Sequence, residues 1–332
     1  MLVKSKGLSV FVSASVMGAL LLTGCGSKSA TTPSAATTSA ASTSTAVVSA
    51  SPAAAQAKAI KHIWGETPIQ GVPTKPIALD FFIVDMLVSL GISPTGIAGT
   101  GATRVPAYIK DKVTSFTDVG ERKAPNLEVI SSVKPDLIIA NPERAKMIKG
   151  DLEKIAPSIA LSDKTYQVIL DDVDLLGGIF NKQEQAKKVR ADLEKKISDA
   201  KGKVKNQPTV LVVGAFDDEM TVWVKKSFPS SLLNDIGFNY AFAGEKEKSE
   251  GTADIATMTV EKLVELNPDV VFIYGDSVDK VKTNPLFKNS KASKENHVFV
   301  VEQDLWARAR GPIAAGLMID QAVNFVNGEA KK

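Results

Sequence analysis

The clearest pattern of apolar and polar positions in this chain occurs twice. Asn126–Ala140 and Thr259–Ile273 align at one constant offset: each has a capping residue, a glutamate two positions later, apolar residues at helical spacing, a Pro-Asp pair and an apolar run. Such a unit predicts a short helix that begins after its N-cap and is followed by a buried strand. Because the chain repeats the unit, we expect two similar lobes with a cleft between them.

Strands and helices alternate in both halves of the chain. Each half opens with a short apolar strand, a helix that ends at a glycine, and a second strand. In the first half these are Ile77–Leu79, Val84–Leu90 with Gly91, and Thr95–Ala98. In the second half they are Val210–Val213, Ser231–Ile236 with Gly237, and Tyr240–Ala243. The alternation predicts an α/β fold with two Rossmann-like lobes, each a parallel sheet covered by helices on both faces.

A long polar helix is predicted between the two halves. Thr165–Phe180 forms a first helix, and after Asn181 a Lys- and Glu-rich segment continues to Lys205 with a narrow apolar stripe of Ala186, Val189, Leu193 and Ile197. About 23 helical residues would span roughly 34 Å, enough to reach from one lobe to the other. Because a helix resists bending, we expect the lobes to move little when a ligand binds.

The N-terminus has the pattern of a lipoprotein export signal. Two lysines in Met1–Lys6 precede the apolar run Gly7–Leu22, which is shorter than the about 20 residues of a membrane-spanning helix. Leu22-Thr23-Gly24-Cys25 matches the bacterial lipoprotein processing site, and Cys25 is the only cysteine in the sequence. We expect cleavage before Cys25 and its lipidation, palmitate included. An ordinary secretory signal is the alternative.

These boundaries divide the chain into five segments. They are a signal peptide 1–24, a lipid-anchored Ser/Thr/Ala-rich tether 25–58, an N-terminal lobe 59–180, a connecting helix 181–205 and a C-terminal lobe 206–332. The tether has too few large apolar residues to order itself. Its length would let the folded part stand off the extracytoplasmic face of the cell membrane through a cell wall, as in a Gram-positive bacterium.

Composition excludes several kinds of site. With one cysteine, an intrachain disulfide and a cysteine metal cluster are impossible, and with two histidines a site of several imidazole ligands is excluded by counting. The formal net charge of +3 loses the two charges of Lys4 and Lys6 with the signal, which leaves +1. This near-balance argues against a nucleic-acid partner.

Catalytic motifs are missing from the sequence. It contains no G-x-S-x-G or H-E-x-x-H, and its S-x-x-K matches lack the S-D-N and K-T-G companions. We therefore predict that the chain is not an enzyme and needs no cofactor. The alternative is an extracytoplasmic hydrolase or lyase, in which His62 or His297 would have to act as the base.

Cationic and aromatic residues gather in loops, several of them directly after predicted strands. The candidates come from both halves of the chain: Arg104, Arg122, Arg144, Trp223, Lys225, Trp306, Arg308 and Arg310. In parallel α/β sheets, ligands bind beyond the carboxyl ends of the strands. Guanidinium groups bind carboxylates and other oxyanions in a fixed, bidentate geometry. We therefore predict a cleft that binds an anionic ligand, although arginines also occupy surface loops that have no function.

Glu128 and Glu261 hold the same position in the two repeated helices. The helix dipole favours an acidic residue in the first turn by a few tenths to about 1 kcal/mol, which explains both glutamates locally. Two exposed carboxylates, one on each lobe, could instead dock on basic residues of a two-fold membrane partner. The residues alone leave both interpretations open.

With these features combined, the chain resembles the substrate-binding lipoproteins of ferric-siderophore and vitamin B12 ABC importers. The resemblance covers Ile60–Val326 and is carried by Gly65-Glu66-Thr67, Ile77–Asp80, Val119–Arg122, Pro125–Glu128, Lys134–Ile138, Ile155–Pro157 and Leu305–Pro312. It implies the class III periplasmic-binding-protein architecture, two α/β lobes joined by a single long rigid helix, with the ligand between the lobes.

The resemblance also implies partners and a ligand. In the family the repeated glutamates engage arginines of the two permease subunits, which carries over to Glu128 and Glu261. We thus expect a monomer that meets an ABC permease dimer with its ATPase subunits. Trp306–Gly311 is most similar to members that bind ferric citrate and related carboxylate chelates. Hydroxamate or catecholate siderophores are the alternative, and cobalamin is more distant.

Iron is expected to arrive already chelated. Direct binding of Fe³⁺ would require protein ligands, and the four tyrosines of the chain are scattered along the sequence. We therefore predict that no metal is held by the protein itself.

Overall fold

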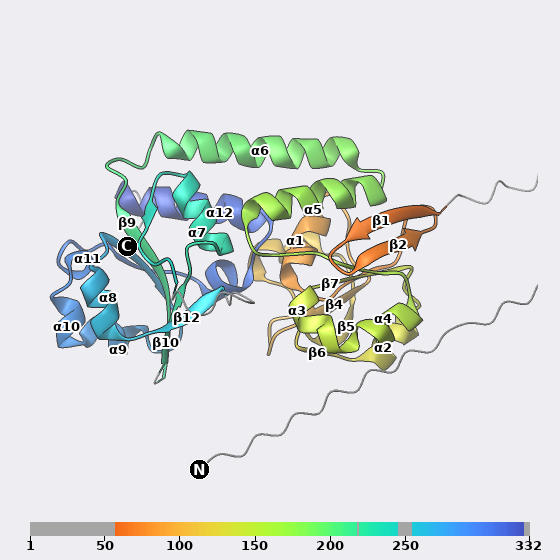
Figure 1. Cartoon of the computed structure of the whole chain (residues 1–332), viewed down its shortest axis with the longest axis horizontal. Coiled ribbons are helices and arrows are strands. Elements are labelled where there is room, and N and C mark those ends of the chain that lie inside the picture. Colours follow the sequence, from red (N-terminus) through yellow and green to blue (C-terminus); the bar gives the residue numbers. More distant parts are fainter. Residues whose placement is uncertain (1–56, 218, 245–253, 329–332) are drawn as a thin grey trace, which may run out of the picture. The chain divides into compact units, whose positions relative to one another are not determined.

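The computed structural model describes residues 57–217, 219–244 and 254–328 (Figure 1). The predicted signal peptide, the lipidation site Cys25 and nearly all of the tether lie outside the described residues. Within them, no helix is both long enough and apolar enough to cross a membrane.

The N-terminal lobe contains a doubly wound sheet of six described strands in the order β6-β5-β4-β3-β7-β8. The strands are β3 (Pro76–Ala78), β4 (Gly96–Gly99), β5 (Thr117–Glu121), β6 (Ala124–Pro125), β7 (Leu137–Ala140) and β8 (Ser158–Ala160). Only β6 is antiparallel to its neighbour among these strands. The chain adds β4 and β5 on one side of β3, then β7 and β8 on the other. Ligands bind where the strand order reverses in this way, beyond the carboxyl ends of the strands.

The C-terminal lobe contains a mixed sheet of six described strands in the order β12-β10-β9-β13-β14, with β11 paired to β9. The strands are β9 (Thr209–Phe216), β10 (Glu219–Trp223), β11 (Asn239–Tyr240), β12 (Ile255–Met258), β13 (Val270–Tyr274) and β14 (Val298–Val300). The expected parallel pairing holds for β9, β11, β13 and β14. β10 and β12 were not expected; β10 pairs antiparallel with β9, and β12 pairs antiparallel with β10.

Helices and a hairpin complete the two lobes, which confirms the predicted α/β fold. The N-terminal lobe has the hairpin β1 (Lys58–His62) and β2 (Gly65–Ile69), with α1 (Phe81–Ser89), η1 (Ala107–Lys112), α2 (Leu127–Val133), α3 (Pro142–Ala145), η2 (Lys146–Ile148), α4 (Lys149–Ile155) and α5 (Tyr166–Ile179). The C-terminal lobe has α7 (Phe228–Asp235), α8 (Val260–Leu266), α9 (Val278–Thr283), α10 (Pro285–Lys288), α11 (Lys291–Lys294), the π-helical turn η3 (Asp304–Arg308) and α12 (Pro312–Val326).

The duplicated sequence unit forms the same structure in both lobes. Its helix, α2 or α8, ends at a residue in the left-handed conformation, Lys134 (φ 52°) or Asn267 (φ 44°). The following aspartate ties two strands together at their starts: Asp136 accepts the N–H of Thr74 (2.6 Å), and Asp269 accepts the N–H of Thr209 (2.6 Å). The repeated Pro-Asp pair thus anchors β7 to β3 in one lobe and β13 to β9 in the other.

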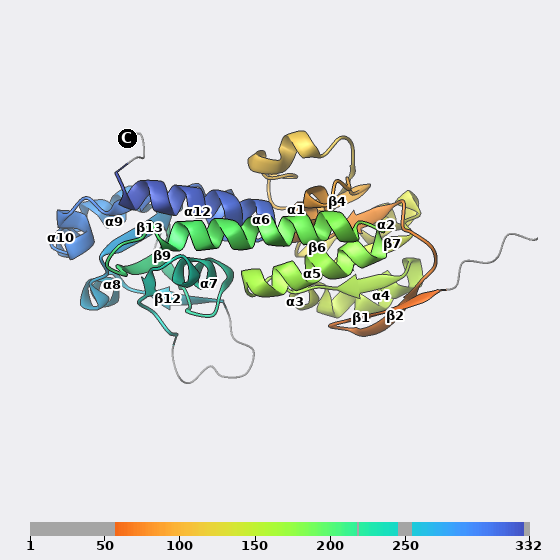
Figure 2. The same cartoon turned by 90° about the horizontal axis from the view of Figure 1, so that it is seen from above.

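The connecting helix α6 (Gln183–Lys201) extends across both lobes (Figures 1 and 2). Its 19 residues correspond to roughly 28 Å, shorter than the predicted length. The helix ends before Lys205 because the chain turns after Gly202, with Asn206 and Gln207 at positive φ. Side chains bind α6 to each lobe: Gln185 Nε2 donates to Ser89 O of α1 (3.0 Å), and Lys196 Nζ donates to Gly316 O of α12 (3.0 Å).

Asp172 on α5 makes the stability of the fold depend on pH. Burial raises its pKa from the usual 3.8 to about 7; the hydrogen bond from Ser162 N–H (3.1 Å) opposes the rise and Asp171 adds to it. The folded protein therefore holds this proton more tightly than the unfolded chain does. In consequence, stability is lost as the pH rises from about 4 through about 7.

We expect Asp172→Asn to remove this loss, because the amide keeps an oxygen for the Ser162 N–H and carries no charge. One pKa unit corresponds to about 1.4 kcal/mol, so the stability gained over the wild type should be about 1–3 kcal/mol larger at pH 8 than at pH 4. Thermal unfolding at both pH values measures the difference. Asp174→Asn, an exposed aspartate on the same helix that does not contribute to the raised pKa of Asp172, is the control. An equal effect of Asp172→Asn at both pH values would contradict the prediction.

Candidate ligand-binding site between the lobes

Asp80 lies at the point where the strand order of the N-terminal sheet reverses. It follows β3 and caps α1, with Oδ1 accepting the N–H of Phe81 (2.7 Å). Its buried carboxylate binds two arginines: Arg122 Nη1 lies 2.9 Å from Oδ1, and Arg144 Nη1 lies 2.8 Å from Oδ2. Arg122 follows β5 and Arg144 lies on α3 directly after β7. Parallel strands of one sheet therefore bring these three side chains together.

Arg122 is the more tightly held of the two arginines. Its Nε donates to Thr100 Oγ1 (2.5 Å), and its guanidinium lies over the ring of Phe81, 4.5 Å from the centroid. The side chain of Arg122 is 10% exposed, whereas that of Arg144 is 24% exposed. Arg144 is therefore the guanidinium of this pair that solvent and a ligand reach more readily.

Arg310 extends the cluster into the C-terminal lobe. It precedes α12 and is buried, and its Nη1 pairs with Asp163, which follows β8 of the N-terminal lobe. The same Nη1 lies 3.8 Å from Asp254 Oδ2, and the guanidinium lies over the ring of Trp223 at 4.9 Å. Arg144 Nη1 is 3.9 Å from Asp163 Oδ2, which links the two arginines. We call Asp80, Arg122, Arg144, Asp163, Asp254 and Arg310 the interlobe charge cluster.

The charges of the interlobe charge cluster balance, with three arginines against three aspartates. Burial opposes ionisation of Arg310, but Asp163, Asp254 and Asp80 outweigh it and raise the pKa of Arg310. Burial also raises the pKa of Asp254, against the attraction of Arg310. The sequence predicted a cleft whose guanidinium groups bind an anionic ligand. In the structure each arginine of the cluster is already paired with a carboxylate of the protein.

Unused hydrogen-bonding capacity nevertheless remains in the cluster. Arg310 Nε is buried and has no hydrogen-bond partner among the described residues, and the same holds for Asp80 Oδ2, whose contact with Arg144 is an ion pair. A buried unpaired donor costs about 1–3 kcal/mol. A ligand oxygen that accepts from Arg310 Nε would recover this free energy.

Arg104 and Arg308 lie at a second contact between the lobes. Arg104 pairs with Asp118 (2.9 Å) and Glu121 (3.1 Å), and Arg308 pairs with Asp304 (2.5 Å). Asp304 also accepts a hydrogen bond from Thr103 Oγ1 of the N-terminal lobe (3.0 Å). A cavity of about 630 Å³ opens here, lined by residues that include Thr103, Arg104, Lys110 and Asp304.

The remaining three predicted residues, Trp223, Lys225 and Trp306, lie in different environments. Trp223 is buried beside Arg310 and donates from Nε1 to the hydroxyl of Tyr274 (3.0 Å). Lys225 is exposed in the turn after β10. Trp306 is 1% exposed in the core of the C-terminal lobe, where its ring stacks on Phe272 (4.5 Å) and its Nε1 donates to Gln321 (2.7 Å). The structure therefore does not bring Trp306 to the ligand side, contrary to expectation.

The sequence search missed the acidic half of the cluster. Asp80 follows a predicted strand just as the arginines do, so a search for polar residues of either sign at strand ends would have found it. Asp163 also follows a strand, β8, but β8 was not among the predicted strands. Asp254 carries no comparable signal, because its partner Arg310 is far away in the sequence. Tyr274 was missed for the same reason: it ends β13 and is buried against Trp223.

Glu128 and Glu261 occupy equivalent exposed positions in the first turns of α2 and α8. Their helices are capped by Asn126, which accepts the N–H of Glu128 (3.1 Å), and by Thr259. Both helices lie on the side of the lobes away from α6 (Figure 1).

Metal-binding chemistry is not apparent in the described part of the chain. Within these residues, no group of three or more His, Cys, Asp or Glu side chains is placed to hold a metal ion.

Comparison with known proteins places the chain in a family. Residues 77–305 match the family model described as "Periplasmic binding protein". The Fe(3+)-citrate-binding protein YfmC of Bacillus subtilis is 34% identical over 255 residues, which cover 74% of this chain and 79% of that protein. The probable siderophore-binding lipoprotein YfiY of the same organism is 30% identical over 328 residues, covering 93% and 95%.

A solved structure supports the same relationship. The crystal structure of Staphylococcus aureus SirA complexed with staphyloferrin B has a TM-score of 0.72 and 26% identity to this chain, and the match covers 81% of this chain and 98% of that one. The family and the fold class inferred from the sequence are thereby confirmed, and the hydrolase alternative is not supported. The chain belongs to the periplasmic binding protein family and is a substrate-binding protein, not an enzyme.

Proposed function

We propose that this protein is an extracytoplasmic substrate-binding lipoprotein that captures an anionic ferric chelate, ferric citrate above all, and delivers it to an ABC permease for iron uptake. The interlobe charge cluster is the observation that supports this most strongly. It places three guanidinium groups beyond the carboxyl ends of the strands, and Arg310 comes from the opposite lobe to Arg122 and Arg144. The names of YfmC, for ferric citrate, and of YfiY, for siderophores, support the same class of ligand.

The aspartates of the cluster prepare the arginines for such a ligand. A guanidinium held by a buried carboxylate loses little conformational entropy when a second anion binds, and this favours affinity. Arg144 contacts both Asp80 and Asp163 through Nη1. We expect its other N–H groups to donate to a carboxylate of citrate.

The charge balance of the cluster also favours a chelate over a bare anion. An anion that enters must share the arginines with three protein carboxylates, so it binds well only where several of its oxygens meet several N–H groups at once. A ferric chelate with multiple carboxylates offers such an array on a rigid frame. A hydroxamate or catecholate ferric siderophore is the second candidate, supported by the name of YfiY.

The remaining partners follow from residues outside the cluster. We propose that lipid on Cys25 anchors the protein to the outer face of the cell membrane. The exposed Glu128 and Glu261 would dock on basic residues of the permease dimer, with which the ATPase subunits associate. Their equivalent positions in the two lobes suit a partner made of two similar subunits.

Arg144→Ala should weaken binding of ferric citrate by about 10- to 150-fold, because it removes charged hydrogen bonds worth about 1.5–3 kcal/mol. Titration by intrinsic fluorescence or calorimetry measures the affinity. Arg190→Ala is the matched control: Arg190 on α6 pairs with Asp171 (2.8 Å) and Asp174 (2.6 Å), away from the cluster.

Unchanged affinity of Arg144→Ala would contradict the proposed role of the cluster. If the wild-type protein does not bind ferric citrate but binds a ferric hydroxamate or catecholate, the second candidate is favoured. A wild-type protein that binds none of these chelates would overturn the proposed function.

The double variant Glu128→Ala, Glu261→Ala should bind ferric citrate as the wild type does but lose nearly all chelate uptake, because docking would lack both carboxylates. Uptake of radioactive iron by cells that produce the variant measures this. Glu184→Ala is the control, since Glu184 is also an exposed glutamate in the first turn of a helix, α6. Normal uptake by the double variant would limit both glutamates to a local role at their helix N-termini.

A further inference from the structure

Asp85 of the N-terminal lobe caps a helix of the C-terminal lobe. Its side chain is fully buried on α1. Oδ1 accepts the N–H of Ile313 (3.0 Å), and Oδ2 accepts the N–H of Ala314 (3.0 Å) and the hydroxyl of Tyr108 (2.7 Å). Ile313 and Ala314 belong to the first turn of α12, so an acidic side chain of one lobe supplies the N-terminal cap of a helix in the other.

The sequence of α12 makes this cap necessary. The N-cap position is Gly311, which has no side chain to accept the orphan N–H groups, and the next residue is Pro312. A Cβ atom at position 311 would lie 2.1 Å from Asp85 Cγ, so glycine is required for the carboxylate to approach. The negative charge also lies at the positive end of the helix dipole. Burial raises the pKa of Asp85 to about 6, against the hydrogen bonds that favour its ionised form.

The contact between α1 and the first turn of α12, called the joint below, has residues of the interlobe charge cluster on both sides. Asp80 is the N-cap of α1, the helix that holds Asp85. Arg310 directly precedes the N-cap of α12, the helix that Asp85 caps. The position of Arg310 relative to Asp80 is therefore determined by two short chain segments and by the hydrogen bonds of Asp85.

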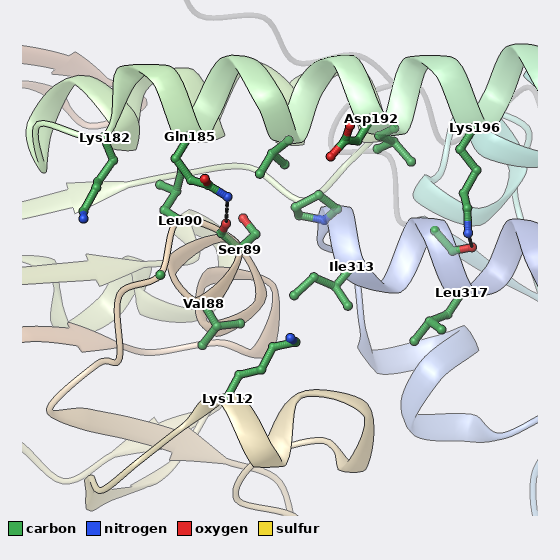
Figure 3. Close-up of a pocket in the computed structure, with 15 residues that line it drawn as sticks. Val88, Ser89, Leu90, Lys112, Lys182, Gln185, Asp192, Lys196, Ile313 and Leu317 are labelled. Atoms are coloured by element: carbon green, nitrogen blue, oxygen red, sulfur yellow. Dashed lines mark hydrogen bonds between the residues drawn. The ribbon is translucent and has the colours of Figure 1, made fainter.

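The connecting helix contacts α1 and α12 beside a groove. A groove of about 740 Å³ lies between α6 and the N-terminal end of α12, lined by residues that include Leu90, Asp192, Ile313 and Leu317 (Figure 3). Gln185 and Lys196 bind α6 to α1 and α12 at separate points, with the groove between them. Together with α6 and the ion pair of Arg310 with Asp163, the hydrogen bonds of Asp85 therefore constrain the angle between α1 and α12 directly.

We propose that Asp85 is a positioning residue for the ligand-binding cleft. By capping α12 across the lobe boundary, it fixes the angle between the lobes and thereby holds Arg310 where it meets the carboxylates of the N-terminal lobe. The consequence for ligand affinity rests on the proposed function, whereas the effect on lobe geometry does not.

The test measures the lobe geometry directly. Spin labels are attached to cysteines introduced at the exposed positions Lys154 on α4 and Lys288 on α10, one in each lobe, in a full-length chain with Cys25→Ser so that no other thiol is present. We expect Asp85→Asn to broaden and shift the distribution of distances between the labels without ligand, because its amide group places N–H donors against an N–H of α12. Its affinity for ferric citrate should fall by about tenfold, the effect expected if the arrangement that places Arg310 for binding is populated to about one tenth.

Asp136→Asn is the matched control. Asp136 accepts the N–H groups of Thr74 and Lys75 and a hydroxyl, the same kinds of bond that Asp85 accepts, but all within one lobe. It should leave both the distances and the affinity unchanged. If Asp85→Asn does not fold, Gly311→Ala provides the second variant, since its methyl group must push α12 away from Asp85.

The experiment distinguishes failure of the inference about Asp85 from failure of the proposed function. Distance distributions of Asp85→Asn and Gly311→Ala that superimpose on the wild type would overturn the inference, as would an equal shift in Asp136→Asn. If the wild-type protein does not bind ferric citrate, the proposed function loses its favoured ligand while the distance measurement still decides the role of Asp85.

Discussion

The ion pair between Arg310 and Asp163 is the interaction on which the arrangement of the site depends. Arg310 is buried at the boundary between the lobes, and removing a guanidinium from water costs several kcal/mol unless carboxylates compensate. Asp163 of the N-terminal lobe and Asp254 of the C-terminal lobe provide that compensation, and the ring of Trp223 covers one face of the guanidinium. Because Arg310 belongs to one lobe and Asp163 to the other, the pair fixes where the lobes meet, and loss of one partner alone would leave the other as an uncompensated buried charge.

The same interaction changes how the site would recognise an anion. A cleft lined by free arginines would attract almost any negative charge, whereas a charge-balanced cluster selects by geometry. The protein carboxylates orient the guanidinium groups, and the unpaired Arg310 Nε marks a direction from which a further acceptor gains a hydrogen bond. Selectivity for one chelate over another would then arise from where the oxygens of the ligand lie, because each must compete with a carboxylate already in place.

The duplicated unit explains why both lobes present similar surfaces. In each lobe an N-cap begins the helix, a residue in the left-handed conformation ends it, and an aspartate ties the next strand to the first strand of the sheet. These contacts fix α2 and α8 in the same orientation relative to their sheets. Glu128 and Glu261 therefore occupy equivalent positions for a structural reason, whether or not a partner uses them.

The sequence by itself determined the features that depend on neighbouring residues. The repeated helix-strand units, the glycine stops and the loops that carry Arg122, Arg144 and Arg310 follow from short-range patterns of apolar, capping and turn residues, and the structure reproduces them within a few residues. Only the tertiary structure decided which groups meet. It paired the arginines with aspartates, buried Trp306 in the core, and brought Asp85 to the start of α12. These contacts join residues far apart in the chain, and no local pattern of residue types specifies which distant side chain will face a given charge once the core has packed.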